Sequence, residues 1–289
     1  MLTSFAHEKA ALQYGNPRGS TQAQREGQMR IISLSPEHER LYCVCLEDWS
    51  DEMKEAGEHK ETWLRKMRDK GLRVKLALDD KGEVGGMIQY VPIEESFVDG
   101  QGLYFVLCVW VHGHKGGRGN FQKRGMGAAL LEAAEADAKE LGAKGMAAWG
   151  MALPVFMRAS WFKKHGYRKA DSQSMQILLW KPFAEGAAPP RWIREKKTPA
   201  LEPGKVAVTA LLSGWCPAMN MTFERTKRAA AELGEKVVFR AVDTLDRQVF
   251  REWGEADALF IDGRALRPGP PPSYEKLRRK IAKQVKKLG

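Results

Sequence analysis

A glutamine and two glycines in residues 121–131, which read FQKRGMGAALL, are spaced to bind an anionic group. Gln122, Gly125 and Gly127 form the pattern Q-x-x-G-x-G directly before an alanine- and leucine-rich run. Glycines at this spacing let the backbone turn sharply, so that bare N–H groups can approach a ligand. A helix that starts there adds its unpaired N–H groups and the positive end of its dipole. The pattern therefore predicts a phosphate or pyrophosphate site, although a glycine-rich helix start also serves as plain turn chemistry.

The neighbouring segments are those needed to hold such a site. Residues 103–111 (LYFVLCVWV) form a continuous apolar run, which is typical of a strand buried on both faces. Residues 128–141 carry apolar side chains at helical spacing and stop at Gly142. A second apolar run at 146–151 precedes a helix-like segment that ends WFKKHGYRKAD. The order strand, glycine turn, helix places the N–H groups of the turn beside the end of the strand.

This succession resembles the GCN5-related N-acetyltransferases (GNAT), over roughly residues 30–183. In that family a Q-x-x-G-x-G turn after the fourth strand holds the pyrophosphate of acetyl-CoA. A later helix closes on a G-F or G-Y pair near the thioester, which Gly166-Tyr167 supplies here. The resemblance implies an α/β protein of the α+β acyltransferase kind, with a mixed, mostly antiparallel sheet, helices on both faces, acetyl-CoA as acyl donor and no metal. The expected cofactor-binding residues are Val109, Trp110, Val111, Gln122, Lys123, Arg124, Gly125, Met126, Gly127 and Ala128.

An amine that attacks a thioester directly in a ternary complex needs no nucleophilic residue from the enzyme. The enzyme has to orient the two partners, take a proton from the ammonium and stabilise the developing oxyanion. Backbone N–H groups at residues 109–111 would stabilise the oxyanion if the strand is splayed or bulged there. The family often places a tyrosine as general acid four residues before the G-F pair, but this chain has Phe162 at that position.

The catalytic acid and base are therefore left open. Ser160, His165 and Tyr167 lie nearby in the sequence, but none of them matches the missing tyrosine by alignment. Glu94 or Glu95 could act as the base, directly or through water, while a solvated loop is the plainer interpretation of both. The candidates that remain are Glu94, Glu95, Ser160 and Tyr167.

Composition limits the class of protein. The 289 residues, 43% of them hydrophobic, can bury one large core or two smaller ones. No apolar run approaches the roughly 20 residues that span a bilayer, and residues 1–28 have no signal-peptide core. Four cysteines, at positions 43, 45, 108 and 216, are too few and too scattered for a disulfide scaffold, which favours a cytoplasmic protein with reduced thiols. The net charge of +11 favours anionic partners, and CoA is one.

Residues 1–29 are polar, and we expect them to form a weakly ordered arm. Ser35 and Pro36 supply a cap and a first-turn proline for the first helix. That helix is expected to contain Leu41, Cys43, Cys45 and Leu46. C-x-C spacing puts the two thiols on different sides of a helix, so core packing is favoured over metal binding.

The insertion HGHKGGRG at residues 112–119 is longer than the usual connection in the family, and its glycines predict mobility. His112, Lys115 and Arg118 could reach phosphates from this loop. The pair His112-x-His114 has no carboxylate or cysteine beside it in the sequence, so a solvated basic loop is favoured over a metal site.

Composition changes after residue 183. Residues 184–204 are rich in alanine, proline and charge, and are expected to form a linker or a strap anchored by Trp192 and Ile193. Residues 205–289 then predict strands at 206–212, 237–242 and 258–261 that alternate with helices. The first of these helices is expected over 217–233, and Ser273 should cap the last one.

The motif Trp215-Cys216-Pro217 resembles the start of the first helix in the thioredoxin-like fold. An acetyltransferase followed by such a domain resembles the YoaP-like acetyltransferases. Met219 stands where a dithiol oxidoreductase has its resolving cysteine, and Asp257 stands near the place of the usual cis-proline. We therefore predict that this smaller α/β domain is not a working oxidoreductase.

The function that follows is transfer of an acetyl group from acetyl-CoA to an unidentified small-molecule or peptide amine. The alternative is a catalytically degenerate CoA-binding or regulatory protein, since the expected tyrosine is missing. The basic last helix invites a nucleic-acid role, but no binding motif accompanies the charge, and its solvent-exposed face explains the same residues.

Overall fold

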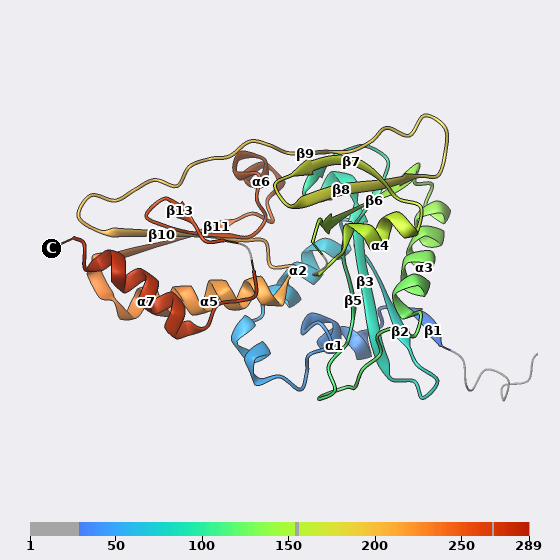
Figure 1. Ribbon diagram of the computed structural model, residues 1–289, viewed down its shortest axis with the longest axis horizontal. Helices are drawn as coiled ribbons and strands as arrows, with labels where there is room; N and C mark the ends of the chain where they lie inside the picture. The colour runs from blue at the N-terminus through green and yellow to red at the C-terminus, as the bar shows by residue number, and fades with distance from the viewer. Residues whose placement is uncertain (1–28, 154–155, 268, 289) are drawn as a thin grey trace, which may run out of the picture.

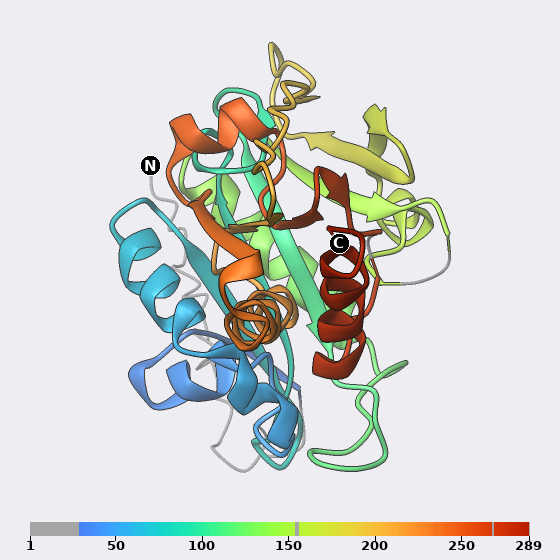
Figure 2. The same ribbon diagram turned by 90° about the vertical axis from the view of Figure 1, so that its left-hand side faces the viewer.

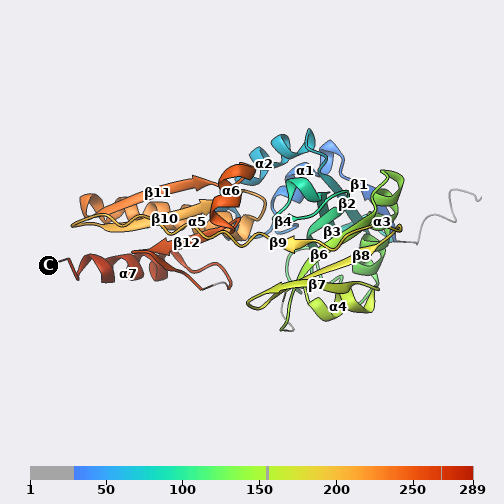
Figure 3. The same cartoon turned by 90° about the horizontal axis from the view of Figure 1, so that it is seen from above.

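The described residues form two large sheets, which lie side by side in Figure 1 and, from above, in Figure 3, and one two-stranded sheet. The computed structural model describes residues 29–153, 156–267 and 269–288. The N-terminal arm expected over 1–29 lies outside the described residues, apart from Met29.

The larger sheet has seven strands in the order β1-β2-β3-β5-β6-β8-β7. Every pair of neighbours is antiparallel except β5 and β6, which run parallel. The strands are β1 (Arg30–Ser33), β2 (Arg73–Leu78), β3 (Val84–Pro92), β5 (Tyr104–Val111), β6 (Gly145–Met151), β7 (Arg168–Gln173) and β8 (Gln176–Pro182). The prediction of a mixed, mostly antiparallel sheet is confirmed.

Helices cover both faces of this sheet. They are α1 (Glu39–Cys43), α2 (His59–Arg68), α3 (Met126–Glu140) and α4 (Ala159–Lys164). Side chains of α1 and α2, such as Tyr42 and Trp63, pack in one hydrophobic core with Leu107 and Cys108 of β5. Side chains of α3 and α4, such as Leu130 and Phe162, pack in a second core on the opposite face. The central strand β5 therefore contributes to both cores, as the continuous apolar run predicts.

The first helix is shorter than the sequence predicts. α1 ends at Cys43. After Val44, the residues Cys45 and Leu46 have left-handed backbone, with φ of 51° and 66°. The Leu46 N–H donates to the Leu41 carbonyl at 3.0 Å, and the Cys45 N–H donates to the Tyr42 carbonyl at 3.0 Å. These two bonds make a Schellman motif, with Cys45 in the position that glycine usually takes. Cys45 therefore lies outside the helix. The sequence does not predict this end of the helix, because no glycine or proline stands there.

The smaller sheet has the strand order β11-β10-β12-β13. β10 (Val206–Leu212) is parallel to β11 (Val237–Asp243) and antiparallel to β12 (Ala258–Ile261), which pairs with β13 (Arg264–Ala265). Three helices alternate with these strands: α5 (Pro217–Glu232), α6 (Arg247–Trp253) and α7 (Tyr274–Val285). The predicted strands and the Ser273 cap are confirmed, since the Ser273 hydroxyl accepts a bond from the Lys276 N–H at 3.3 Å. The short strand β13, which completes a hairpin after Asp262-Gly263, is missing from the prediction.

The segment between the two sheets follows the surface of both parts, and is the gold chain along the upper edge of Figure 1. Within it, β9 (Arg191–Trp192) pairs antiparallel with β4 (Val98–Asp99) of the first part. Further on, the Lys197 N–H donates to the Glu252 carbonyl of α6 at 2.9 Å. Ile193, between these two anchors, is 2% exposed.

The two parts are also joined directly. Figure 2 shows α5 between the helices of the first part and α7, and α5 contacts both α2 and the 3-10 helix η3 (Asp51–Ala56). Arg225 of α5 is 4% exposed and pairs with Glu55 of η3 at 2.9 Å. His59 of α2 lies 2.8 Å from Glu224 of α5. The C-terminal part thus covers the face of the first sheet that carries α1 and α2.

Candidate functional site

Backbone N–H groups are gathered without partners at the start of α3. The turn before this helix has left-handed residues at Lys123 (φ 63°) and Gly125 (φ 83°), and Gly125 is the helix cap. Within the helix, bonding begins where the Ala129 N–H donates to the Gly125 carbonyl at 3.1 Å. The N–H groups of residues 126–128 therefore have no partner among the described residues, as expected for the first turn of a helix. A β-carbon on Gly125 would meet no heavy atom within 4 Å, so the space outside the turn is open.

The walls of this turn are formed by aromatic and aliphatic side chains. A β-carbon on Gly127 would lie 3.4 Å from Trp161 of α4 and 3.9 Å from Val111 of β5. The Gln122 amide donates to the Val111 carbonyl at 3.5 Å, which ties the turn to the end of the strand. Lys123 and Arg124 are exposed at the same turn, so two positive charges stand beside the open N–H groups. This combination suits a phosphate or pyrophosphate group.

The strand β5 is both bulged and split beside this turn. Gln89 of β3 pairs with Cys108, but the next residue, Tyr90, pairs with Val106, so Leu107 is the extra residue of a bulge. On its other side β5 pairs with β6 only over Tyr104–Val106. Beyond that point the two parallel strands separate, and the edge of β5 that faces β6 is left without a strand partner.

Two side chains fill the split. The Trp149 indole N–H donates to the Leu107 carbonyl at 2.8 Å, and the Val109 N–H donates to the sulfur of Met157 at 3.3 Å. A thioether is a weak acceptor, so the Val109 N–H is held by a bond that a carbonyl oxygen can replace. The split therefore offers a backbone donor that points into the gap between β5 and β6, near the end of the strand that leads to the start of α3.

Residues 34–167 match the family model described as "Acetyltransferase (GNAT) family". This match supports a GNAT acetyltransferase domain in this part of the chain. The match takes in α1 through α4 and β2 through β6, including the turn before α3 and the split in β5. The residues of the second sheet lie outside it. A comparison with curated proteins returned no match to the chain.

Several solved structures are similar to the GNAT part. A GNAT family acetyltransferase from Brucella melitensis in complex with acetyl-CoA is 18% identical, with a TM-score of 0.37, and the alignment covers 54% of this chain and 89% of that one. The GNAT family N-acetyltransferase YhbS from Escherichia coli in complex with CoA is 15% identical, with a TM-score of 0.40 and coverage of 55% and 86%. A GNAT-family protein from Desulfovibrio desulfuricans is 17% identical, with a TM-score of 0.41 and coverage of 54% and 99%.

The two candidate glutamates of the GNAT domain lie in the 3-10 helix Ile93–Glu95, and both are engaged. Glu94 accepts a bond from the Gly102 N–H at 2.8 Å. Glu95 pairs with Lys70 at 3.0 Å. The acidic side chain at Asp99 on the same connection pairs with Arg251 of α6 at 2.7 Å.

The candidates near α4 lie in different environments. Ser160 is exposed, whereas Tyr167 is 3% exposed and its hydroxyl is buried without a hydrogen-bond partner among the described residues. Burial first, and then the nearby Glu135 carboxylate, raises the pKa of Tyr167 well above its usual value. Phe162 is fully buried against the rings of Trp161 and Tyr167, with centroids 4.9 and 5.5 Å away.

The loop at residues 112–119 is less solvated than the sequence predicts. His112 is fully buried and accepts a bond from the Trp49 indole at 3.1 Å, while its other ring nitrogen lies 2.6 Å from the Gly119 carbonyl. Arg118 pairs with Asp48 at 3.0 Å and with Glu83 at 3.2 Å. His112 and Arg118 are therefore occupied by protein groups, and of the three basic side chains only Lys115 is exposed.

Contrary to the expectation for the pair of histidines, a carboxylate does lie beside them. The Glu47 oxygens are 3.7 Å from His112 and 3.9 Å from His114. No group of three or more His, Cys, Asp or Glu side chains in the described ranges is arranged to hold a metal ion, this cluster included. Nor does any helix in the described part of the chain have the length and apolar character needed to cross a membrane.

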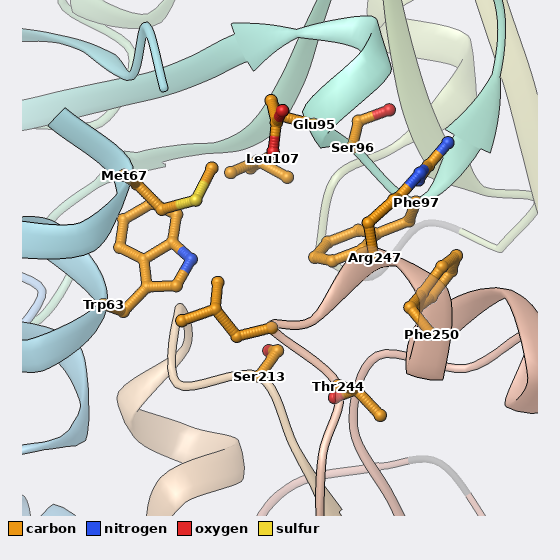
Figure 4. Close-up of a pocket in the computed structure, with 11 residues that line it drawn as sticks. Trp63, Met67, Glu95, Ser96, Phe97, Leu107, Ser213, Thr244, Arg247 and Phe250 are labelled. Carbon is orange, nitrogen blue, oxygen red and sulfur yellow. The ribbon is translucent and has the colours of Figure 1, made fainter. Parts of the chain in front are cut away.

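A small cavity lies where the GNAT domain meets the C-terminal part (Figure 4). Met67 and Trp63 of α2, Glu95 and Leu107 line it from the first domain. From the second domain it is lined by Ser213, Thr244, Leu245, Arg247 and Phe250. Its volume of about 20 Å³ is room for about one water. The bulge at Leu107 gives this cavity its contact with the central strand.

Proposed function

We propose that the protein transfers the acetyl group of acetyl-CoA to an amine, with the pyrophosphate bound at the start of α3 and the thioester in the split of β5. The observation that carries this proposal is the set of open N–H groups at residues 126–128 beside exposed Lys123 and Arg124. The dipole of the 15-residue helix α3 adds a positive field at the same point. Acetyl-CoA bound there would supply the thioester, which reacts with amines without a metal.

The Val109 N–H would stabilise the oxyanion that develops when the amine attacks. Its present partner, the Met157 sulfur, is a poor acceptor, so exchange for a charged oxygen is favourable. A single such donor typically contributes about 3 kcal/mol to transition-state stabilisation. Trp110 and Val111 follow Val109 on β5 and would line the pantetheine arm, together with Gln122.

The acceptor would approach from the face of β5 that carries Leu107 and Cys108, because the α3 face is filled by its own core. On that face the C-terminal domain closes the space, and the cavity at the junction lies beside Glu95. A carboxylate there suits a cationic amine, and Glu95 could take its proton directly or through water. With room for about one water, the cavity has to widen before an amine can enter.

The second domain supports the proposal of a thioredoxin-like module and of a YoaP-like acetyltransferase. The elements follow in the order βαβαββα, and the strands lie in the sheet in the order second, first, third, fourth. Both orders resemble those of the thioredoxin-like fold. Cys216 caps the first helix of this domain, and Asp257 faces the same loop by accepting bonds from the Ser213 N–H and hydroxyl at 2.9 Å. The four cysteines are free, which supports a cytoplasmic location.

Cys216 is better suited to packing than to exchange chemistry. Burial, followed by the nearby Cys45 and Asp257, raises the pKa of the Cys216 thiol to about 12, which outweighs the helix dipole. In an insulin-reduction assay with dithiothreitol, we expect no catalysis above background by either the wild type or Cys216→Ser. Turnover by the wild type that is lost in the serine variant would show that the domain is redox-active after all.

The acetyl transfer itself is expected to be seen as release of free CoA when acetyl-CoA is incubated with a panel of amines. Measurement with a thiol reagent requires a correction for the protein's own four thiols. Glu95→Gln should lower turnover while leaving CoA binding unchanged, because the side chain lies on the acceptor side. Glu94→Gln is the matched control, since Glu94 is held by the Gly102 N–H. If none of the amines in the panel causes release of CoA, although CoA still binds, the degenerate CoA-binding protein is favoured instead.

A further inference from the structure

A lysine is buried at the junction of the two domains with no carboxylate to balance it. Lys60 of α2 is 1% exposed. Its ammonium donates to the Tyr42 carbonyl at 3.0 Å and lies 4.0 Å from the centre of the Tyr42 ring. Its third contact is the sulfur of Cys45 at 3.2 Å. Within the described ranges no Asp or Glu oxygen comes within the 4.0 Å of an ion pair.

A buried ammonium without an anion is costly, since transfer of a charge from water to a protein interior requires a partner of opposite sign. The carbonyl and the ring face compensate only part of this cost, because both are neutral. Cys45 is the ionisable group in direct contact with the nitrogen. Its sulfur therefore lies where a negative charge would balance that of Lys60.

Cys45 also differs from the other three cysteines in its position. It alone among the four stands in a left-handed position, that of the motif that ends α1, with φ of 51°, and like Cys216 it is partly exposed. A non-glycine residue in this conformation is strained, and here that conformation places the sulfur against Lys60. Cys43 and Cys108 are 3% and 5% exposed. Burial raises the pKa of Cys43 to about 12 and that of Cys108 well above its usual value.

We propose that Cys45 is a modification site for peroxides, an ammonium-paired thiolate at the domain junction that is oxidised to a sulfenic acid. The thiolate sulfur attacks one oxygen of hydrogen peroxide or an alkyl hydroperoxide, and the O–O bond breaks. A sulfur–oxygen bond forms, the sulfur loses two electrons to the peroxide, and hydroxide or alkoxide leaves with a proton from water. This proposal does not depend on acetyl transfer, because it rests on the contact between Lys60 and Cys45 alone.

The first test is made on the wild-type chain. Iodoacetamide is added in limiting amount at neutral pH, and the modified cysteine is located by mass spectrometry after trypsin digestion. Cys43 and Cys45 fall on the same tryptic peptide, LYCVCLEDWSDEMK, so fragment ions have to separate them. We expect Cys45 to react first, and faster in the folded protein than in urea. A folded rate below the rate in urea overturns the proposal without any variant.

The second test changes the lysine. Lys60→Met keeps the length of the side chain and removes its charge, and we expect the alkylation rate of Cys45 to fall about tenfold. Lys60→Arg should restore much of the rate. Cys43 serves as the internal control: if it stays unreactive in Lys60→Met, the fold is intact and a fall at Cys45 reports the lost charge. An unchanged Cys45 rate with protected Cys43 contradicts the proposal.

The third test detects the oxidised product. Hydrogen peroxide is added with dimedone, which traps sulfenic acids, and the adduct is expected on Cys45 in the wild type. It should be lost in Cys45→Ser and retained in Cys216→Ser, which also lacks one junction thiol. An adduct on Cys216 with none on Cys45 would show that Cys216 is the reactive thiol and so refute the inference.

Discussion

Gly127→Glu is expected to abolish the thermal stabilisation that CoA gives to the protein. A ligand at about 100 times its dissociation constant adds roughly 2.7 kcal/mol to the free energy of unfolding. The new side chain would place a negative charge at the first turn of α3, where the proposed pyrophosphate lies, and its bulk would meet Trp161, 3.4 Å from the β-carbon. Melting curves of wild type and variant with and without CoA measure the effect.

Gly127→Ala is the matched control, because its methyl group makes only ordinary contacts with Trp161 and Val111. Alanine in the first turn should also raise the stability of the unliganded protein, by up to about 1 kcal/mol. We expect this variant to keep most of the shift with CoA. If Gly127→Glu, folded and melting near the wild type, still shows the full shift, the ligand binds elsewhere.

Asp137→Asn is expected to destabilise the protein by about 3 kcal/mol, the lower end of the range for a broken buried ion pair. Asp137 on α3 is 8% exposed and receives bonds from Arg73 (2.7 and 2.9 Å), Lys75 (2.8 Å) and the Tyr90 hydroxyl (2.7 Å). An amide leaves two cations without their carboxylate, although Arg73 keeps some access to water. Urea unfolding at neutral pH measures the loss, and Glu140→Gln, an exposed change on the same helix, should cost less than about 0.5 kcal/mol.

The same carboxylate predicts the direction of a pH dependence. Burial alone would raise the pKa of Asp137, but the bonds from Arg73, Lys75 and Tyr90 hold it well below its usual range. The native state therefore binds this proton less readily than the unfolded chain, so the stabilisation is complete above about pH 4 and declines as the pH falls further. Asp137→Asn should lack this part of the acid dependence. A variant with the same acid profile as the wild type would show that other carboxylates control it.

Local chemistry made the central part of the fold predictable. The start of α3 could be predicted from neighbouring residues alone. Gly125 permits the left-handed backbone of the turn, and the apolar residues after it have helical spacing. The same holds for β5, whose unbroken apolar run reflects burial on both faces. In the second sheet, β10 and β12 begin and end at the residues expected from their composition.

Contacts between distant residues were not predictable in this way. The cysteines look scattered in the sequence, yet at the domain junction Cys45 lies close enough to Cys108 and Cys216 to raise the pKa of both. The link from Arg225 to Glu55 spans 170 positions, and no periodicity signals it. His112 was expected in solvent because its neighbours in the sequence are rich in glycine. Its contact with Trp49, which is distant in the sequence, could not be predicted from them. Side chains whose partners come from another element carry no local pattern.

The connection between the two sheets has a consequence for how the protein comes apart. It is paired with β4 at one end and bonded to α6 at the other, and Gly254 approaches it so closely that a β-carbon would lie 2.1 Å from the Glu195 carbonyl. A hinge needs backbone that is free to rotate, and here the backbone is fixed by both partners. The connection therefore holds the two sheets in a fixed arrangement and is not a flexible linker. We therefore expect heat or denaturant to unfold both sheets in one cooperative transition, instead of as two independent units.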